Sequence, residues 1–154
     1  MADQEIKKRK LPIPDWYSTL SDFQKRSWRN AGFQLANTVI PYLLLFCFML
    51  YTRAQQWPYW STFLLSMPAS LFLVRIFILF HDCTHESFVP SKRGNQIVGF
   101  FTGALVFTSY ESWRMSHLRH HATNGQLDHR GTGDVYTMTL EEYRNAPRRE
   151  RLRY

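Results

Sequence analysis

The sequence predicts an all-α membrane protein, in which a transmembrane helical hairpin precedes a histidine-rich region on the cytosolic side of the membrane. Two apolar blocks, residues 31–51 and 57–80, contain a single charged residue, Arg75. Each block is long enough, as a helix, to cross about 30 Å of hydrocarbon. Only residues 52–56 separate the blocks, so the second helix is expected to return antiparallel to the first. Five of the six histidines follow in two short groups.

The two blocks have further features of membrane helices. Each contains one proline, Pro41 or Pro68, which transmembrane helices tolerate because neighbouring groups satisfy the freed backbone. Aromatic residues at 57–60 predict a belt at the membrane–water interface. Arg75 leaves two interpretations open. Its guanidinium either reaches lipid headgroups from near the helix end or pairs with a buried carboxylate near a functional site.

Residues 1–30 are predicted to form a basic cytosolic leader. The leader contains clustered cations: Lys7, Lys8, Arg9 and Lys10. Asp15 or Ser18 is expected to cap a short amphipathic helix that runs through Trp28 on the membrane surface. The 52–56 link carries only one cation, Arg53. The positive-inside rule therefore places the leader in the cytosol, and two crossings return the chain to the cytosol at about residue 81.

A third apolar run, residues 96–110, is short for a membrane span and contains Gly99 and Gly103. This length favours a re-entrant or interfacial helix over a crossing. The whole region 81–154 is then expected to stay on the cytosolic side. The chain therefore divides into a leader (1–30), a hairpin (31–80) and this histidine-bearing region (81–154).

Composition narrows the classes of partner. The net charge of +7 fits nucleic acid, anionic lipid or an acidic protein. The two apolar blocks favour lipid, and we expect no nucleic-acid partner. Cys47 and Cys83 are expected to form no disulfide, because Cys47 lies within an apolar block and Cys83 beside a histidine.

The histidine spacing predicts metal binding. His81 and His85 are four residues apart, so on a helix both imidazoles share a face. His117 precedes His120 by three residues and His121 by four, which places all three near one face. His120 and His121 are neighbours, however, and point about 100° apart on a helix. Five imidazoles crowd a single ion, so the pattern favours two metals.

Imidazole suits zinc, copper, iron and nickel. A zinc hydrolase of the HExxH type needs glutamate after its first histidine, and here that residue is Asp82. An all-histidine set at a membrane surface fits iron and oxygen chemistry better.

Several residues near the histidines have more than one interpretation. Asp82 and Glu86 either orient ligand imidazoles or serve ordinary solvation and capping. Cys83 is expected to pack rather than bind metal, because it lies two residues after His81. Tyr110 and Trp113 are expected to anchor the chain at the interface, with the lining of a lipid path as the alternative. His129 stands alone in a polar stretch and is interpreted as a surface histidine.

At these residues the sequence resembles the membrane fatty acid desaturases of the acyl-lipid type. HDCTH at 81–85, followed by ESF, is similar to the first histidine box of that family. WRMSHLRHH at 113–121 is similar to the second box, and residues 122–143 resemble its continuation. The resemblance covers roughly residues 60–145.

The resemblance implies an oxygen-dependent enzyme that introduces a double bond into a lipid acyl chain. It implies two iron ions, dioxygen as co-substrate, and electrons from ferredoxin or a b-type cytochrome. The residues that match the ligand boxes are His81, His85, His117, His120 and His121. The third box and the second pair of membrane helices have no counterpart here, so the chain is expected to be an N-terminal fragment that is inactive alone.

The sequence leaves two rival hypotheses open. A lipid or alkane hydroxylase, or a carotenoid oxygenase, would share histidine boxes of this type, although residues 122–143 favour the desaturase. A non-enzymatic membrane protein that binds or transports metal would need polar groups through its spans. The only charged residue in either block is Arg75, which argues against transport.

Overall fold

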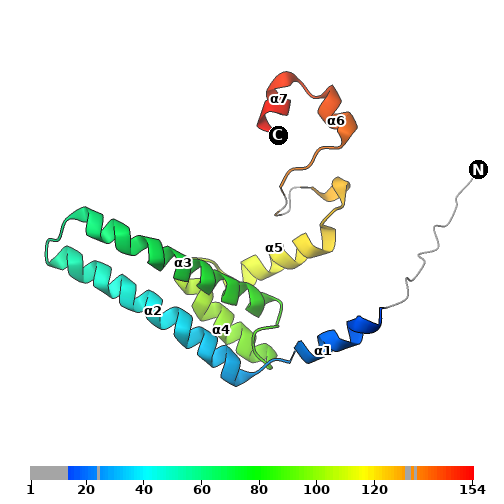
Figure 1. Cartoon of the computed structure of the whole chain (residues 1–154). Helices are drawn as coiled ribbons and strands as arrows, with labels where there is room; N and C mark the ends of the chain where they lie inside the picture. The colour runs from blue at the N-terminus through cyan, green and yellow to red at the C-terminus, as the bar shows by residue number, and fades with distance from the viewer. Residues whose placement is uncertain (1–13, 24, 131–132, 134) are drawn as a thin grey trace, which may run out of the picture.

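The computed structural model describes residues 14–23, 25–130, 133 and 135–154, and these form helices and connecting turns with no strand. The predicted all-α class is therefore confirmed. The cations at 7–10 lie outside the described residues. Figure 1 shows the elements in order: a 3₁₀ turn Asp15–Thr19, α1 Leu20–Phe23, α2 Trp28–Ala54, α3 Tyr59–Thr84, α4 Lys92–Leu105, α5 Tyr110–Thr123, a 3₁₀ turn Leu127–His129, α6 Leu140–Asn145 and α7 Arg148–Arg153.

The predicted hairpin is confirmed, because α2 and α3 lie side by side and antiparallel (Figure 1). A tight turn joins them, with Gln56 at a positive φ of 56° and the Trp57 amide donating to the Thr52 carbonyl at 2.9 Å. α2 runs past both predicted bounds, whereas α3 begins slightly after its predicted start at residue 57 and runs past its predicted end at residue 80. The extension of α3 to Thr84 matters most, since it places the first histidine group on the end of a membrane helix.

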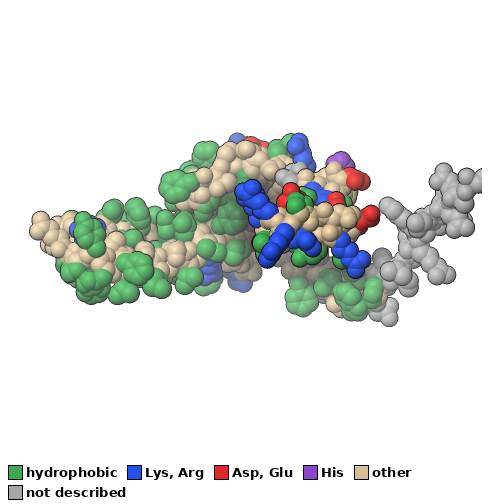
Figure 2. All heavy atoms as spheres, turned by 90° about the horizontal axis from the view of Figure 1, so that it is seen from above, with side chains coloured by type: hydrophobic (Ala, Val, Ile, Leu, Met, Phe, Trp, Pro, Cys, Tyr) green, Lys and Arg blue, Asp and Glu red, His purple; other side chains and the backbone are tan. Residues whose placement is uncertain are grey.

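The surface of the hairpin is apolar and largely open. Only 6% of the most apolar window of α2 and 22% of that of α3 is buried within the chain. A core helix of a water-soluble protein would bury most of such a window. Figure 2 shows hydrophobic side chains along the hairpin, and most of the Lys and Arg side chains lie away from its turn, towards the other end of the molecule. The exposed apolar surface is therefore what a bilayer would cover.

The leader differs from the expected amphipathic helix. Its helical part is a 3₁₀ turn with Pro14 at the N-cap, followed by the single turn α1, which ends at Phe23. Trp28 instead begins α2. The break has a local cause: Ser27 is extended, with φ −137° and ψ 128°, and serves as the N-cap of α2.

The third apolar run is divided between two helices. Its first part belongs to α4, which begins at Lys92 because the Ser91 hydroxyl accepts from the Gly94 amide at 3.1 Å. α4 ends at Leu105, and the run's last residue, Tyr110, begins α5. The 14 residues of α4 are fewer than a membrane crossing needs. Its re-entrant or interfacial position stays a prediction.

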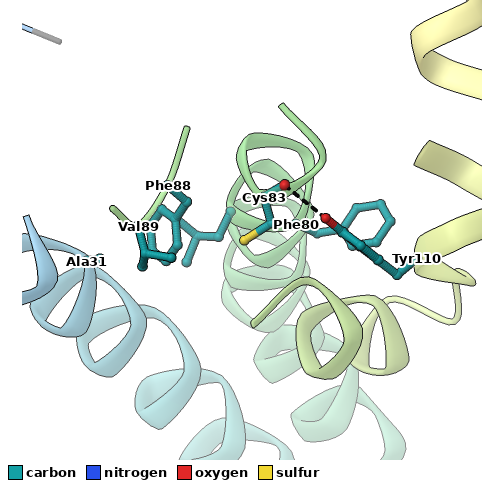
Figure 3. Close-up of a cluster of buried hydrophobic side chains, with 7 residues drawn as sticks. Ala31, Phe80, Cys83, Phe88, Val89 and Tyr110 are labelled. Carbon is teal, nitrogen blue, oxygen red and sulfur yellow. Dashed lines mark hydrogen bonds between the residues drawn. The ribbon is translucent and has the colours of Figure 1, made fainter. Parts of the chain in front are cut away.

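The buried core lies at the end of the hairpin that is remote from the turn. Figure 3 shows side chains from four segments meeting there, and the cluster comprises Ala31, Leu79, Phe80, Cys83, Phe88, Val89 and Tyr110. Cys83 is a buried free thiol that packs in this core, whereas Cys47 is an exposed free thiol. The core thus joins the end of α3 to the start of α5, the two segments that carry the histidines.

Two glycines allow α4 to fit into this core. A Cβ on Gly99 would lie 2.2 Å from Tyr110 Cε2, and one on Gly103 would lie 2.9 Å from Phe80 Cε2. Any larger residue would therefore push α4 away from the aromatic rings. Gly99 and Gly103, which argued against a membrane span in the sequence, are thus the positions where α4 packs most closely against Tyr110 and Phe80.

Candidate metal centre

Two helix ends bring the histidines together. His81 lies in the last turn of α3, and His85 is the residue that caps this helix. His117, His120 and His121 lie on α5, which begins at Tyr110. The Tyr110 hydroxyl donates to the Cys83 carbonyl at 3.0 Å, a buried bond that ties the start of α5 to the end of α3 (Figure 3). The two histidine groups therefore meet through long-range packing.

Four of the five candidate ligands converge. One ring nitrogen from each of His81, His85, His117 and His121 lies within 4.8 Å of the other three. His117 is central, because its Nε2 is 2.9 Å from His85 Nε2 and 3.0 Å from His121 Nε2. His81 and His85 thus present ring nitrogens to one another, and so do His117 and His121 on α5, whereas His120 does not join them.

The donor set fits a metal ion. Two imidazole nitrogens bound at right angles to one ion, each about 2.1 Å from it, are about 3.0 Å apart. The two separations at His117 Nε2 match that value. Hydrogen bonds alone do not account for this arrangement. His117 Nε2 faces two other ring nitrogens, but a neutral Nε2 has either one proton or one lone pair and so can bond well with only one of them. A cation shared by the ring nitrogens would satisfy every lone pair.

The electrostatics of the cluster keep its central ring neutral. Burial, followed by the nearby His81, His121, His85 and His120 rings, lowers the pKa of His117 from 6.5 to about 4. Burial and the neighbouring His81 and His121 rings also lower the pKa of His85, against a smaller opposing effect of Asp82. A neutral imidazole presents the lone pair that a metal needs.

His120 lies apart from the group of four. Its ring centroid is 6.1 Å from that of His117 and 5.6 Å from that of His121. Its side chain instead faces Gly133, at which an added Cβ would lie 3.6 Å from His120 Cβ. This divergence of two neighbouring residues agrees with their expected angle on a helix. A second metal beside His120 stays a prediction.

Aromatic packing supports the central histidine. The Trp113 ring stacks on His117 at a centroid distance of 4.2 Å and an interplanar angle of 17°. Trp113 also contacts Phe80 at 5.0 Å and Phe77 at 5.5 Å. It therefore connects the buried core to the ligand cluster. Tyr110 is buried in the core, not placed as an interfacial anchor.

The two acidic residues of the first group have different partners. Asp82 Oδ1 lies 3.5 Å from His81 Nδ1, close enough to orient that ring. Glu86 Oε1 accepts from Arg114 Nη2 at 3.1 Å and lies 3.4 Å from Lys92 Nζ. Glu86 therefore links the first histidine group to α4 and α5, a role that the sequence analysis did not foresee.

Other predicted residues lie away from the cluster. His129 is exposed in the second 3₁₀ turn, as expected for a surface histidine. Arg75 donates to Asn37 Oδ1 on α2 at 3.0 Å, a partner that neither of its two interpretations named, and its contact with lipid headgroups stays a prediction.

Sequence reasoning also missed Asn95. It is fully buried, accepts from the Phe88 and Val89 amides, and donates to the Val89 and Ser91 carbonyls. These bonds fix the loop after His85. The available sequence signal for a buried structural role was a polar residue in the first turn of the helix that carries the third apolar run.

Comparison with known proteins decides the family. Residues 54–154 match the model of the fatty acid desaturase family, and this match covers more than half of the chain. The chain belongs to the fatty acid desaturase family. The family and the two apolar helices together indicate a membrane protein. Its histidine cluster could bind a metal ion.

The desaturase relatives come from several groups of organisms. A fatty acid desaturase of Bacillus subtilis (strain 168) is 46% identical over 132 residues, which is 86% of this chain and 37% of the relative. The sn-1 acyl-lipid omega-3 desaturase (ferredoxin) of Nostoc sp. (strain 36) is 29% identical over 63% of this chain and 26% of the relative. The Delta(12) fatty acid desaturase of Mortierella alpina is 35% identical over 49% of this chain and 18% of the relative.

The chain thus spans between 18% and 37% of the length of each of these curated relatives. No solved structure matches the chain.

Proposed function

We propose that this chain carries the first two histidine boxes of an oxygen-dependent di-iron acyl-lipid desaturase. The observation that supports this most strongly is the convergence of four imidazoles at the end of an apolar hairpin. The family assignment favours desaturation over hydroxylation, the rival chemistry on similar boxes. Because the match spans only part of each relative, the whole activity, its substrate and its electron donor are included in the proposal.

His81, His85, His117 and His121 would hold one iron together, and His120 would serve the second iron from its separate position. Bound iron, with dioxygen, supplies the oxidising power needed to remove hydrogens from unactivated methylenes. The protein's own residues provide position. Trp113 stacks on the His117 ring and fixes its orientation, and Asp82 lies beside His81. The Glu86–Arg114 ion pair joins the two boxes.

The acyl chain of a membrane lipid would reach this site directly from the bilayer. The hairpin exposes apolar side chains along its length, and the histidines lie where it ends, so a lipid tail need not cross water. We further propose a multi-pass topology with the histidine boxes on the cytosolic face, which follows from the positive-inside rule.

The electron donor would be ferredoxin or a b-type cytochrome. Exposed arginines on α5 and α7, among them Arg119, Arg148, Arg149 and Arg151, would attract an acidic donor. The Nostoc relative carries ferredoxin in its name, which supports a donor of this kind.

A fusion protein tests the proposal. Residues 1–154 are joined to the segment of the Bacillus subtilis relative that follows the matched region, and the fusion is expressed in a Bacillus subtilis strain lacking its own desaturase. We expect unsaturated acyl chains by gas chromatography of the membrane lipids, abolished by His81→Ala and retained by the matched surface variant His129→Ala. A membrane-inserted, iron-loaded fusion that makes no double bond would contradict the proposal, and hydroxylated chains would favour the hydroxylase.

A further inference from the structure

The helix α4 has no role in the proposed desaturase chemistry. It lies beside the histidine end of the hairpin and packs mainly against α3 (Figure 1). The sequence leaves two positions open for it, one flat on the membrane surface and one that re-enters the membrane. These positions differ in the direction of the helix axis, so the contacts along α4 distinguish them.

On one side, α4 runs back along α3 towards the turn of the hairpin. A Cβ on Gly99 would lie 3.1 Å from Cys83 Cβ, near the end of α3. One turn later, a Cβ on Gly103 would lie 2.9 Å from Phe80 Cε2. The contacts on α3 therefore move back along that helix as α4 proceeds, which a helix crossing the hairpin at right angles would not show.

On its other side, α4 follows α2 in the same direction. A Cβ on Gly94, in the first turn of α4, would meet the ring of Trp28, the residue that begins α2. Farther along, Leu35 and Val39 of α2 line an apolar groove together with α4 residues between 97 and 105. Val39 lies about 16 Å along α2 from Trp28. α4 therefore reaches about halfway through a hydrocarbon core of about 30 Å.

The exposed side chains of α4 change from charged to apolar along the helix. Lys92 and Arg93 begin it, and the exposed side chains that follow Gln96 are apolar. The hydroxyl of Thr102 is buried and donates to the Val98 carbonyl at 2.8 Å. A helix that lies flat on a membrane keeps a polar face towards water along its length. Within residues 97–105, all of which the structure describes, α4 offers no such face.

The turn after α4 exposes an aromatic side chain and satisfies backbone amides internally. Phe107 is 93% exposed, at a positive φ of 55°. The Val106 and Thr108 amides donate to the Gly103 carbonyl at 3.2 and 2.8 Å. The Phe107 amide donates to the Ala104 carbonyl at 3.3 Å. Unsatisfied backbone groups are costly in hydrocarbon, so these bonds suit a turn that lies beneath the membrane surface.

We infer that α4 is a re-entrant helix, which descends into the leaflet on the histidine side and exposes an apolar face to lipid acyl chains, namely Ile97, Phe100, Phe101 and Phe107. This face continues the lipid-facing surface of the hairpin, and Lys92 and Arg93 stay at the headgroups. The inference requires only that the chain lies in a membrane, so it stands or falls separately from the desaturase proposal.

The depths of two residues on one face of α4 test the inference. Ile97 and Phe101 are four residues apart on the helix and are 52% and 64% exposed. Each is replaced by cysteine in a Cys47→Ser background, in which the remaining native thiol, Cys83, is buried. The chain is spin-labelled and reconstituted into phosphatidylcholine vesicles. Electron paramagnetic resonance then compares relaxation of the label by oxygen, which enters the bilayer, with relaxation by a water-soluble nickel chelate.

Two further variants calibrate the depth. Leu44→Cys, an exposed position in the middle of α2, gives the hydrocarbon reference. Leu152→Cys, an exposed position on α7, gives the water reference. Circular dichroism checks that each labelled variant keeps the helical content of the unlabelled chain.

We expect the label of Phe101→Cys to lie up to about 6 Å deeper than that of Ile97→Cys, the rise of four residues along a helix that points into the membrane. The label of Phe107→Cys should lie deeper than both. All three should be more accessible to oxygen than to the nickel chelate, as at Leu44→Cys.

Three results would overturn the inference. Equal depths of the Ile97→Cys and Phe101→Cys labels would mean a helix that lies flat on the surface. Accessibility to the nickel chelate equal to that of Leu152→Cys would place α4 in water. Labels shielded from both reagents would mean that protein, such as a second copy of the chain, covers this face instead of lipid.

Discussion

The two ends of the hairpin are held together by different surroundings. Near the turn, Tyr59 is 79% and Phe63 66% exposed, so their contacts are left for the bilayer. At the histidine end, Ile76, Phe80 and Cys83 are fully buried among residues of α2, α4 and α5. The ligand geometry therefore depends on packing within the protein, whereas the turn end depends on lipid. Substitutions at the two ends should therefore have unequal effects on the metal centre.

The largest effect is expected at the centre of the ligand cluster. Removing the His117 ring leaves His85 and His121 without their closest neighbour, so His117→Ala should lower metal affinity more than about 100-fold, beyond the loss typical of residues that only support a ligand. His129→Ala should leave the affinity unchanged. Calorimetric titration with Fe²⁺ under anaerobic conditions measures both, and equal affinities would contradict the assigned cluster.

A matched pair of phenylalanines tests the comparison itself. Phe80 is fully buried and contacts both Tyr110 and Trp113, so Phe80→Ala should cost about 3–5 kcal/mol of unfolding free energy. Phe63→Ala, at the exposed end, should cost less than about 1 kcal/mol, because no packed cavity forms. Denaturant unfolding in micelles gives both values. Similar costs would mean that the two ends are stabilised alike.

A matched pair of glycines tests how closely α4 packs. In Gly99→Ala the new methyl would lie 2.2 Å from Tyr110, so overpacking should cost about 1–3 kcal/mol and weaken metal binding. Gly32 has no atom within 4 Å of an added Cβ, so Gly32→Ala should stabilise α2 by about 0.5–1 kcal/mol. Thermal unfolding followed by circular dichroism distinguishes the two. Stabilisation by both variants would refute the close contact.

A further prediction concerns pH in the metal-free chain. The folded pKa of His117 is about 4, and its ordinary value is 6.5. As pH falls from about 6.5 to about 4, the unfolded chain binds a proton at this residue and the folded chain does not, so stability should decrease through that window. Above pH 6.5 the residue contributes no pH dependence. His117→Gln should flatten the profile, measured by unfolding in chelator, and an unaltered profile would exclude His117 as its origin.

The sequence predicts local geometry well and long-range geometry poorly. Length and composition locate both membrane helices, and the spacing of His81 and His85 predicts their shared face. The approach of the two histidine groups depends on contacts between distant residues, such as Tyr110 with Cys83 and with Gly99. Helical spacing also could not decide which of His120 and His121 joins the cluster, since that choice follows from how α5 docks against α3.

Polar residues were the hardest to interpret. Arg75 donates to an amide on the antiparallel helix, a partner that neither expected interpretation named, at a register that no local pattern reveals. Glu86 was considered as a support for imidazole, and it contacts Arg114 and Lys92. In both cases the side chain's chemistry was evident, and the partner depended on tertiary structure.

We propose that His81, His85, His117 and His121 bind one metal together. Iron K-edge X-ray absorption of the iron-loaded chain tests it most directly, because scattering from imidazole rings reports how many histidines surround each iron. We expect about four imidazoles at the iron in the wild-type chain and about three in His121→Ala. Two or fewer imidazoles, or a number unchanged by His121→Ala, would contradict it.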